Sequence, residues 1–230
     1  MIDIRSAILN ALPRELLIDL EDRLRAAALK AAEVVRKELP LNAKRSREAE
    51  GQIRFRLQEQ SYEEVVQQHG GYLLPDGVMW GTDLKVFQPF ARFPGSEVGI
   101  ILGFAAMAEP GKIPSKNQSR AAGVTLNVSL QPSLFDEDDC PKPSDIFVLF
   151  LTARDRQQAG MIEEIAIGVI GAAYKDFIFY ASLDDFLRGY DSKPVVPDEP
   201  DGSGPKVKLR PTRKLFVPPE KQPDTEVGEE

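Results

Sequence analysis

The sequence predicts an α+β fold in which N-terminal helices pack on a mainly antiparallel or mixed sheet. Helical patterns cluster before residue 70, whereas short apolar runs and alternating runs dominate from residue 70 to residue 190. Helices and strands that are segregated along a chain are typical of this class. The links between the later strands are too short to hold crossover helices, which disfavours a doubly wound parallel sheet.

The first predicted helix lies between Pro13 and Pro40. Leu16, Leu20 and Leu24 recur every four residues, and alanines and valines continue the same stripe. Proline is tolerated in the first turn of a helix, and a helix usually ends before a later proline. Such a stripe either packs on the domain or pairs with another chain, and packing is favoured because no strict heptad repeat is sustained.

A second helix is predicted from Lys44 to His69, with Asn42 opening it and Gly70 as the left-handed residue that ends it. Apolar residues alternate with arginines in the stretch Ile53–Leu57, so a strand is the alternative there. His69 is the only histidine. It is predicted to cap or pack the last turn, and a catalytic role is the alternative.

Five strands are predicted between residues 98 and 180. Four are short apolar runs, as expected for buried strands, and the fifth alternates apolar with polar residues over Val124–Leu130. A short helix is predicted over Leu183–Tyr190, with Ser182 as its N-cap. The four apolar runs are Val98–Met107, Ile146–Leu151, Ile162–Ile170 and Phe177–Tyr180.

The predicted domain covers residues 1–190 and is helical over 1–69 and sheet-rich over 70–190. Residues 191–230 are rich in proline, glycine and charged residues, which predicts a disordered tail. The net charge of −7 argues against a protein that coats nucleic acid or anionic membrane by bulk electrostatics. A local basic patch is compatible with this charge.

The remaining bulk features point to a soluble cytoplasmic protein without a membrane partner. The N-terminus has no basic region followed by an apolar one, and no apolar run approaches the roughly 20 residues that a membrane span needs. The single cysteine, Cys140, cannot form an internal disulfide, and no Cys/His cluster is present to hold zinc.

The candidate catalytic motif is Pro75-Asp76 followed by Asp83-Leu84-Lys85. It resembles the signature of the PD-(D/E)xK superfamily, which includes many restriction endonucleases. The resemblance implies that Asp76 and Asp83 bind Mg²⁺, and that Asp83 and Lys85 are catalytic, with the lysine orienting or activating water. Magnesium prefers hard oxygen ligands, and residues two apart on a strand share one face. The alternative is a turn aspartate and an ion pair on a strand.

The segments around the motif add to this resemblance. A glutamate-bearing helix that ends at Gly70-Gly71 and is followed by a hairpin is similar to the family's opening helix-to-sheet arrangement. The family's core continues with strands, which the runs Val98–Met107 and Ile146–Leu151 would supply. The glutamates of that helix are Glu48, Glu50, Glu59 and Glu63.

Two basic stretches are candidates for contacts with the phosphates of DNA or RNA. Mixtures of cationic and small polar side chains suit contacts with a nucleic-acid backbone. The alternative is that these are solvated faces. The candidate residues are Lys44, Arg45 and Arg47 in the first stretch, and Lys112, Lys116 and Arg120 in the second.

A candidate partner-binding peptide runs from Gln131 to Phe135. It resembles the Gln-x-x-Leu-Phe peptide by which bacterial repair and replication proteins dock on the sliding clamp. The residues that carry the resemblance are Gln131, Leu134 and Phe135. Adjacent apolar tips in a polar loop suit a small hydrophobic pocket. The alternative is that Leu134 and Phe135 staple the end of a strand.

These features lead to one predicted function and one alternative. The prediction is a nucleic-acid-associated protein with a nuclease-like core and magnesium-dependent hydrolysis of phosphodiester bonds. The alternative is a non-catalytic accessory or adaptor protein that binds protein partners through its N-terminal helix and C-terminal tail. One histidine and one cysteine leave no convincing nucleophilic triad, and no Walker loop or dinucleotide fingerprint is present.

Overall fold

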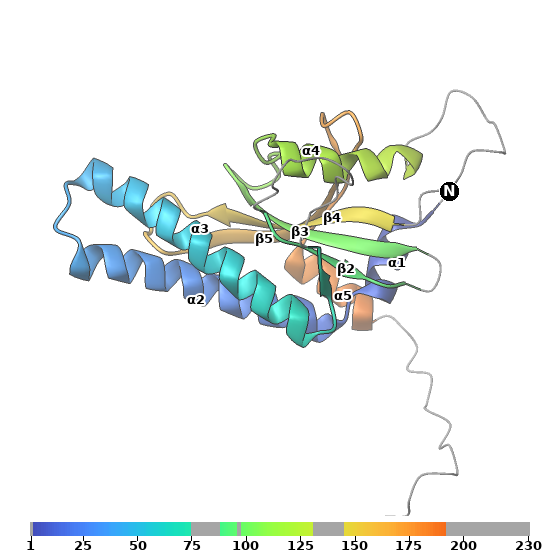
Figure 1. The fold of residues 1–230 in the computed structure, drawn as a ribbon, viewed down its shortest axis with the longest axis horizontal. Helices are drawn as coiled ribbons and strands as arrows, with labels where there is room; N and C mark the ends of the chain where they lie inside the picture. Colours follow the sequence, from blue (N-terminus) through green and yellow to red (C-terminus); the bar gives the residue numbers. More distant parts are fainter. Residues whose placement is uncertain (1, 75–87, 96–97, 131–144, 192–230) are drawn as a thin grey trace, which may run out of the picture. The chain divides into compact units, whose positions relative to one another are not determined.

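Helices and a mixed sheet build the α+β fold that the sequence predicts (Figure 1). The computed structural model describes residues 2–74, 88–95, 98–130 and 145–191. All of these belong to one compact unit, Met1–Pro194. The predicted tail after Asp191 lies outside the described residues.

Three helices open the chain. They are α1 (Ile4–Ala11), α2 (Arg14–Glu38) and α3 (Ala43–Gln68). Asn42 caps α3, because its side-chain oxygen accepts a hydrogen bond from the backbone nitrogen of Arg45 at 3.0 Å. Gly70 follows α3 with φ of 78°, a left-handed conformation that favours glycine.

The bounds of α2 and α3 confirm two of the predicted helices, and the strand alternative for Ile53–Leu57 is wrong, since those residues are helical. The separate helix α1 was not predicted. Its N-cap is Asp3, whose carboxylate accepts from the backbone nitrogens of Arg5 and Ser6.

The described strands form one sheet in the order β1-β2-β3-β4-β5-β6. Every neighbouring pair is antiparallel except β3 and β4, which are parallel. The sheet is therefore mixed, within the predicted class. The strands are β1 (Tyr72–Leu73), β2 (Phe90–Phe93), β3 (Gly99–Met107), β4 (Asp145–Arg154), β5 (Ile162–Ile170) and β6 (Phe177–Ser182).

Both faces of the central strands are buried. Ile100, Leu102 and Phe104 of β3 pack in one apolar cluster with residues of α1, α2, α3 and α5, whereas Ile101 and Ala105 pack in a second cluster with α4. Successive residues of a strand point to opposite faces, so one apolar run serves both clusters. Figure 1 shows α4 on the opposite side of the sheet from α5.

The predicted strand over Val124–Leu130 is wrong. Residues Gln118–Thr125 form α4, and Leu126–Leu130 continue as a 3-10 helix. Asn127 explains the difference. Its side chain is buried and bonds to the backbone of Phe147 through both its oxygen and its nitrogen, at 2.9 and 3.0 Å. A polar side chain that points inward breaks the alternation that the strand prediction assumed.

The last described helix, α5 (Leu183–Asp191), follows β6 directly and confirms its prediction. Ser182 caps it, since its hydroxyl oxygen accepts from the backbone nitrogen of Asp185 at 3.3 Å. The hydroxyl of Tyr190 donates to the carbonyl of Leu12 at 2.8 Å and joins α5 to the start of the chain. None of the described helices is long and apolar enough to cross a membrane.

An ion pair between β2 and β4 crosses the start of β3. Arg92 of β2 donates from Nε and Nη2 to the two carboxylate oxygens of Asp145 of β4, at 2.8 and 3.0 Å. Gly99 of β3 lies between them, and a Cβ atom there would meet an Asp145 oxygen at 2.1 Å. The two-point contact therefore requires glycine at this position.

Candidate functional site

The predicted catalytic and metal-binding residues, Asp76, Asp83 and Lys85, lie outside the described residues. The described residues on either side contact neighbouring strands, Leu74 contacting β2 and Gln88 contacting β3. The backbone nitrogen of Leu74 donates to the carbonyl of Phe90 at 2.8 Å. The side chain of Gln88 donates to the carbonyl of Phe104.

The predicted clamp-binding residues, Gln131, Leu134 and Phe135, also lie outside the described residues. In the part of the chain that the structure describes, no group of three or more His, Cys, Asp or Glu residues could hold a metal ion. Both predictions therefore stay predictions.

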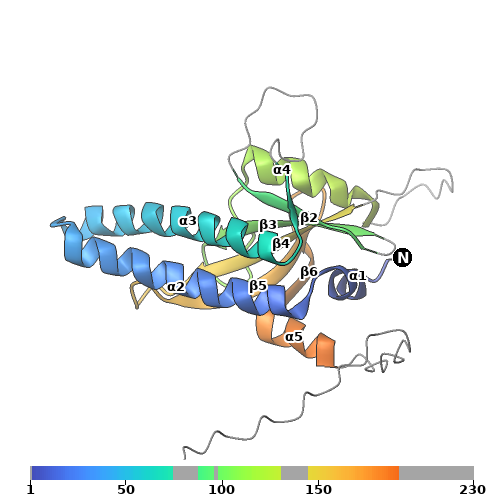
Figure 2. The ribbon, with the colours of Figure 1, turned by 60° about the horizontal axis from the view of Figure 1, so that its bottom comes forward.

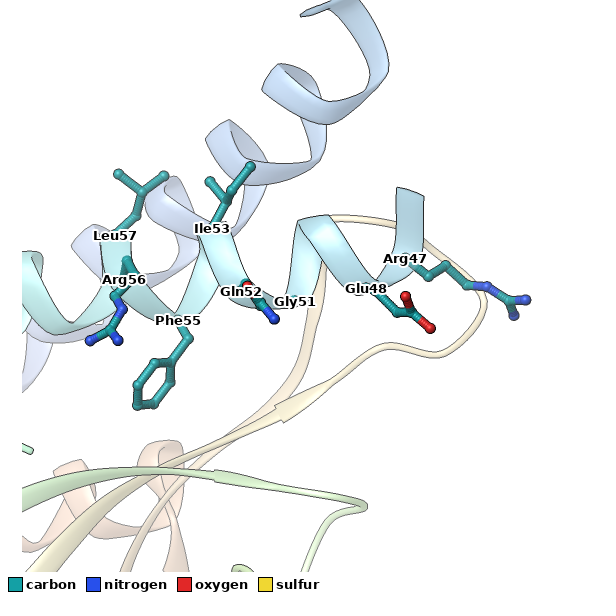
Figure 3. A pocket seen from close by; sticks show the side chains of 8 residues that line it. All are labelled: Arg47, Glu48, Gly51, Gln52, Ile53, Phe55, Arg56 and Leu57. Atoms are coloured by element: carbon teal, nitrogen blue, oxygen red, sulfur yellow. The ribbon is translucent and has the colours of Figure 1, made fainter. Parts of the chain in front are cut away.

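An open surface depression of about 880 Å³ lies along the first half of α3, and we call it the α3 pocket (Figure 3). Both apolar and charged side chains line it, so it offers contact surface as well as hydrogen-bonding groups. The described lining residues are Arg47, Glu48, Gly51, Gln52, Ile53, Phe55, Arg56 and Leu57.

Phe55 is held at the pocket by contact with the sheet. Its ring centroid lies 6.3 Å from that of Phe104 in β3, and Figure 3 shows the ring pointing from α3 toward the strands. Two turns later Tyr62 is buried and donates from its hydroxyl to the carbonyl of Leu102 at 2.6 Å. Burial raises the pKa of Tyr62 far above its ordinary value. These contacts fix α3 on β3.

Glu59 lies between these aromatic residues on the same side of α3 and is 7% exposed. Its carboxylate pairs with Arg56, with Arg56 Nη1 and Glu59 Oε2 2.9 Å apart. Burial raises the pKa of the Glu59 carboxyl, and Arg56 opposes this effect without cancelling it. Glu59 does not itself line the α3 pocket, and it is linked to that surface through Arg56.

The first predicted basic stretch lies at the start of α3. Lys44, Arg45 and Arg47 are exposed, and Arg47 lines the α3 pocket. The Nε atom of Arg47 donates to the carbonyl of Ala43 at 3.3 Å, which leaves the rest of its guanidinium available to a ligand.

The second predicted basic stretch lies before α4 and within it, on the other face of the sheet. Lys112 pairs with Glu109, and the Lys116 ammonium lies 5.7 Å from the ring centroid of Tyr174. Arg120 is only 9% exposed and donates to the carbonyl of Ser115. The fold therefore does not bring the two basic stretches together, and it buries Arg120.

A buried charged cluster that the sequence did not reveal joins α3 to the β4–β5 turn. Glu50 Oε1 lies 3.8 Å from Arg54 Nη1 and 3.8 Å from Arg154 Nη2, and it accepts from the backbone nitrogen of Gly160 at 3.4 Å. Burial is the main cause that lowers the pKa of Arg54, and the charge of Arg154 adds to it. The cluster ties the start of α3 to the sheet.

An exposed apolar surface lies where α2 turns into α3, and we call Leu29, Leu39 and Leu41 the hairpin-tip patch. Leu29 is 51% exposed. The three leucines line a groove of about 590 Å³ together with Arg36 and Arg47. Apolar patches with a polar rim are typical of interaction sites.

Comparison with known protein families, curated proteins and solved structures gives no match to this chain.

Of two residues that sequence reasoning missed, one carries a weak signal in the sequence. Gly51 lies in the interior of a predicted helix, where glycine is unfavourable, and this could have marked it. Gln88 has no such signal. Its importance follows from the fold, because its side-chain oxygen accepts from the N-cap Asn117 at 3.0 Å and links β2 to α4.

Proposed function

We propose that this is a nucleic-acid-associated protein with a nuclease-like core that hydrolyses phosphodiester bonds with magnesium. The observation that carries the proposal is the α3 pocket, where arginines and carboxylates meet an aromatic ring that contacts β3. Arg47 and Arg56 suit contacts with phosphate oxygens.

The order of elements supports the same proposal. The glutamate-bearing helix α3 is followed by the antiparallel pair β1 and β2, and then by β3 and β4. This order agrees with the helix-to-sheet arrangement and the continuing strands on which the resemblance to the PD-(D/E)xK superfamily rests.

Asp76 and Asp83 would hold the magnesium ion through carboxylate oxygens, which are ligands that this ion prefers. When bound, magnesium lowers the pKa of a coordinated water and stabilises charge on phosphate. Lys85 would orient the water. Arg47 and Arg56 would position the nucleic-acid strand against α3.

A nuclease assay tests the proposal. Purified protein is incubated with single- and double-stranded DNA and RNA in the presence of Mg²⁺ or Mn²⁺. We expect cleavage that needs the metal and falls by more than about 100-fold in Asp83→Ala and in Lys85→Ala. Asp22→Ala, at an exposed position of α2, is the matched control and should keep full activity. Cleavage that survives both motif substitutions would remove these residues from the mechanism.

A second candidate function, a non-catalytic accessory protein that binds protein partners through α2, is favoured by the hairpin-tip patch. Leu29 and Leu41 on this patch would dock a partner's apolar side chains. Size-exclusion chromatography tests this function. A stable complex with a protein partner that is lost in Leu29→Glu would support it. A divalent-ion effect on Tm that Asp83→Ala abolishes supports the first.

A further inference from the structure

We infer that the α3 pocket receives an unpaired nucleic-acid base, so that the protein prefers single-stranded DNA or RNA to a duplex. The inference rests on the proposed function, because it names the substrate class of the same surface. Three features of α3 point to it: an interior glycine, an aromatic ring and a balanced set of charges.

Gly51 leaves open space in the wall of the pocket. It lies in the interior of α3, where glycine is less favourable than any residue except proline. Its φ is not left-handed, and no described atom lies within 4 Å of the Cβ that a larger residue would carry. Neither backbone conformation nor packing among the described residues therefore calls for glycine here. The open space suits a flat ligand that lies against the helix.

Phe55 supplies an aromatic surface one turn further along the same pocket. Its contact with Phe104 holds the ring in place, and the carbon of the Arg56 guanidinium lies 6.0 Å from the ring centroid. Bases stack on aromatic rings and on arginine planes with little dependence on sequence. The Arg56 side chain is 74% exposed, so it can move aside for a base and turn to its phosphate.

Gln52 and Glu48 supply groups that can bond to the edge of a base. Both are exposed on the pocket side of α3 (Figure 3). The amide of Gln52 both donates and accepts, and the carboxylate of Glu48 accepts from an exocyclic amino group. These edges are free in a single strand and paired in a duplex.

The charges around the pocket also favour binding of a single strand over a duplex. Arg47 and Arg56 are opposed by Glu48 and Glu59, and the chain as a whole carries a net charge of −7. Attraction to phosphates alone would therefore give weak binding. Stacking of a base on the aromatic ring adds affinity for a single strand. A duplex does not gain this affinity, because its bases are already stacked and paired with one another.

Fluorescence anisotropy tests the inference. A labelled single strand of mixed sequence is compared with its blunt duplex, in low salt and with EDTA so that no metal-dependent cleavage occurs. We expect the single strand to bind about tenfold more tightly or better, the scale of one stacked base.

Substitution of the glycine separates a functional role from a structural one. Gly51→Ala should raise Tm by about 2–4 °C, because alanine favours the helix, and should weaken single-strand binding by about tenfold. Phe55→Leu keeps an apolar contact with Phe104 and should weaken binding to a similar degree. Ser61→Ala, on the same helix in a separate groove against α2, is the control and should leave binding unchanged.

The outcomes distinguish this inference from the proposed function. Equal affinity for duplex and single strand, or single-strand affinity that is unchanged in Gly51→Ala and Phe55→Leu, would overturn the base pocket and leave the nucleic-acid function in place. A Tm that falls in Gly51→Ala would show that the glycine is structural and would also overturn it. Absence of binding to the single strand would also overturn the inference, whereas the proposed function is decided by the metal-dependent cleavage assay.

Discussion

The two long helices, α2 and α3, lie side by side but bury different kinds of side chain (Figure 2). The buried residues of α2 are all leucine, alanine or valine. The buried residues of α3 include Glu50, Gln58 and Glu59 in addition to Tyr62 and two valines. The comparison teaches that α2 supports the fold, whereas α3 retains polar groups at the expense of stability.

The buried polar groups of α3 are held by specific partners. The side-chain nitrogen of Gln58 donates to the carbonyl of Leu24 in α2 at 3.2 Å, and Glu59 pairs with Arg56. Buried polar groups need such partners, and apolar residues would have packed at lower cost. Of these groups, Glu59 is linked to the α3 pocket, because its partner Arg56 lines that surface.

Truncation of α2 should give the largest effect on stability. Leu20→Ala removes a fully buried side chain from the main apolar cluster and should lower the free energy of unfolding by about 2–5 kcal/mol. Urea unfolding followed by circular dichroism measures the change. Leu29→Ala, at an exposed position of the same helix, should change it by less than about 0.5 kcal/mol. Similar losses at both positions would contradict the supporting role of α2.

Loss of one buried hydroxyl on α3 should have a smaller effect. Tyr62→Phe keeps the ring but leaves the carbonyl of Leu102 without this donor, which should cost about 1–3 kcal/mol. The same unfolding experiment applies. Tyr72→Phe is the control, because Tyr72 is 70% exposed and should tolerate the change. No loss in Tyr62→Phe would mean that the hydroxyl does not anchor α3.

Glu59→Gln should stabilise the protein at neutral pH, by less than the two effects above. Burial raises the pKa of the Glu59 carboxyl, so the folded state binds its proton more tightly than the unfolded state does. Ionisation of Glu59 therefore costs more in the folded state than in the unfolded state. The free energy of unfolding falls as the pH rises from the ordinary pKa of a glutamate to the raised pKa of Glu59 in the folded protein. The Tm advantage of Glu59→Gln should be present at pH 7 and vanish near pH 3, about one unit below the ordinary value. A lower Tm at pH 7, or an advantage shared by the exposed Glu64→Gln, would contradict this assignment.

The exposed arginine of the pocket should affect binding without affecting stability. Arg47→Gln should weaken nucleic-acid binding and reduce the slope of log affinity against log salt by about 1. Anisotropy titrations at several salt concentrations measure the slope, and Tm should stay constant. Arg23→Gln, at an exposed position of α2, should leave the slope unchanged, and equal effects of the two substitutions would place the binding surface elsewhere.

The helices and strands could be predicted from the sequence wherever apolar residues recur with the spacing of a single kind of element. The four-residue spacing of Leu16, Leu20 and Leu24 predicted α2, and the long apolar runs predicted β3, β4 and β5. The prediction from alternating apolar and polar residues was wrong at Val124–Leu130. These seven residues are helical, and the side chain of Asn127 is buried against Phe147.

The candidate site could be predicted only in part. Arg47 was among the predicted phosphate contacts, but nothing in the sequence shows that Arg120 is buried on the other face of the sheet. The pocket itself depends on Phe55 touching β3, a contact between residues far apart in the chain. Asp76, Asp83 and Lys85 lie outside the described residues, so their roles stay predictions.

The pair formed by Arg92 and Asp145 has a consequence for how the chain tolerates change. A shift of β4 by one residue would turn Asp145 to the other face and leave Arg92 unmatched, so the alignment of the parallel strands has one solution. Asn127 adds a second fixed point, because its side chain bonds to the backbone of Phe147 in β4. An insertion within α4 or the 3-10 helix would move Asn127 away from this partner, so that part of the connection cannot change length freely.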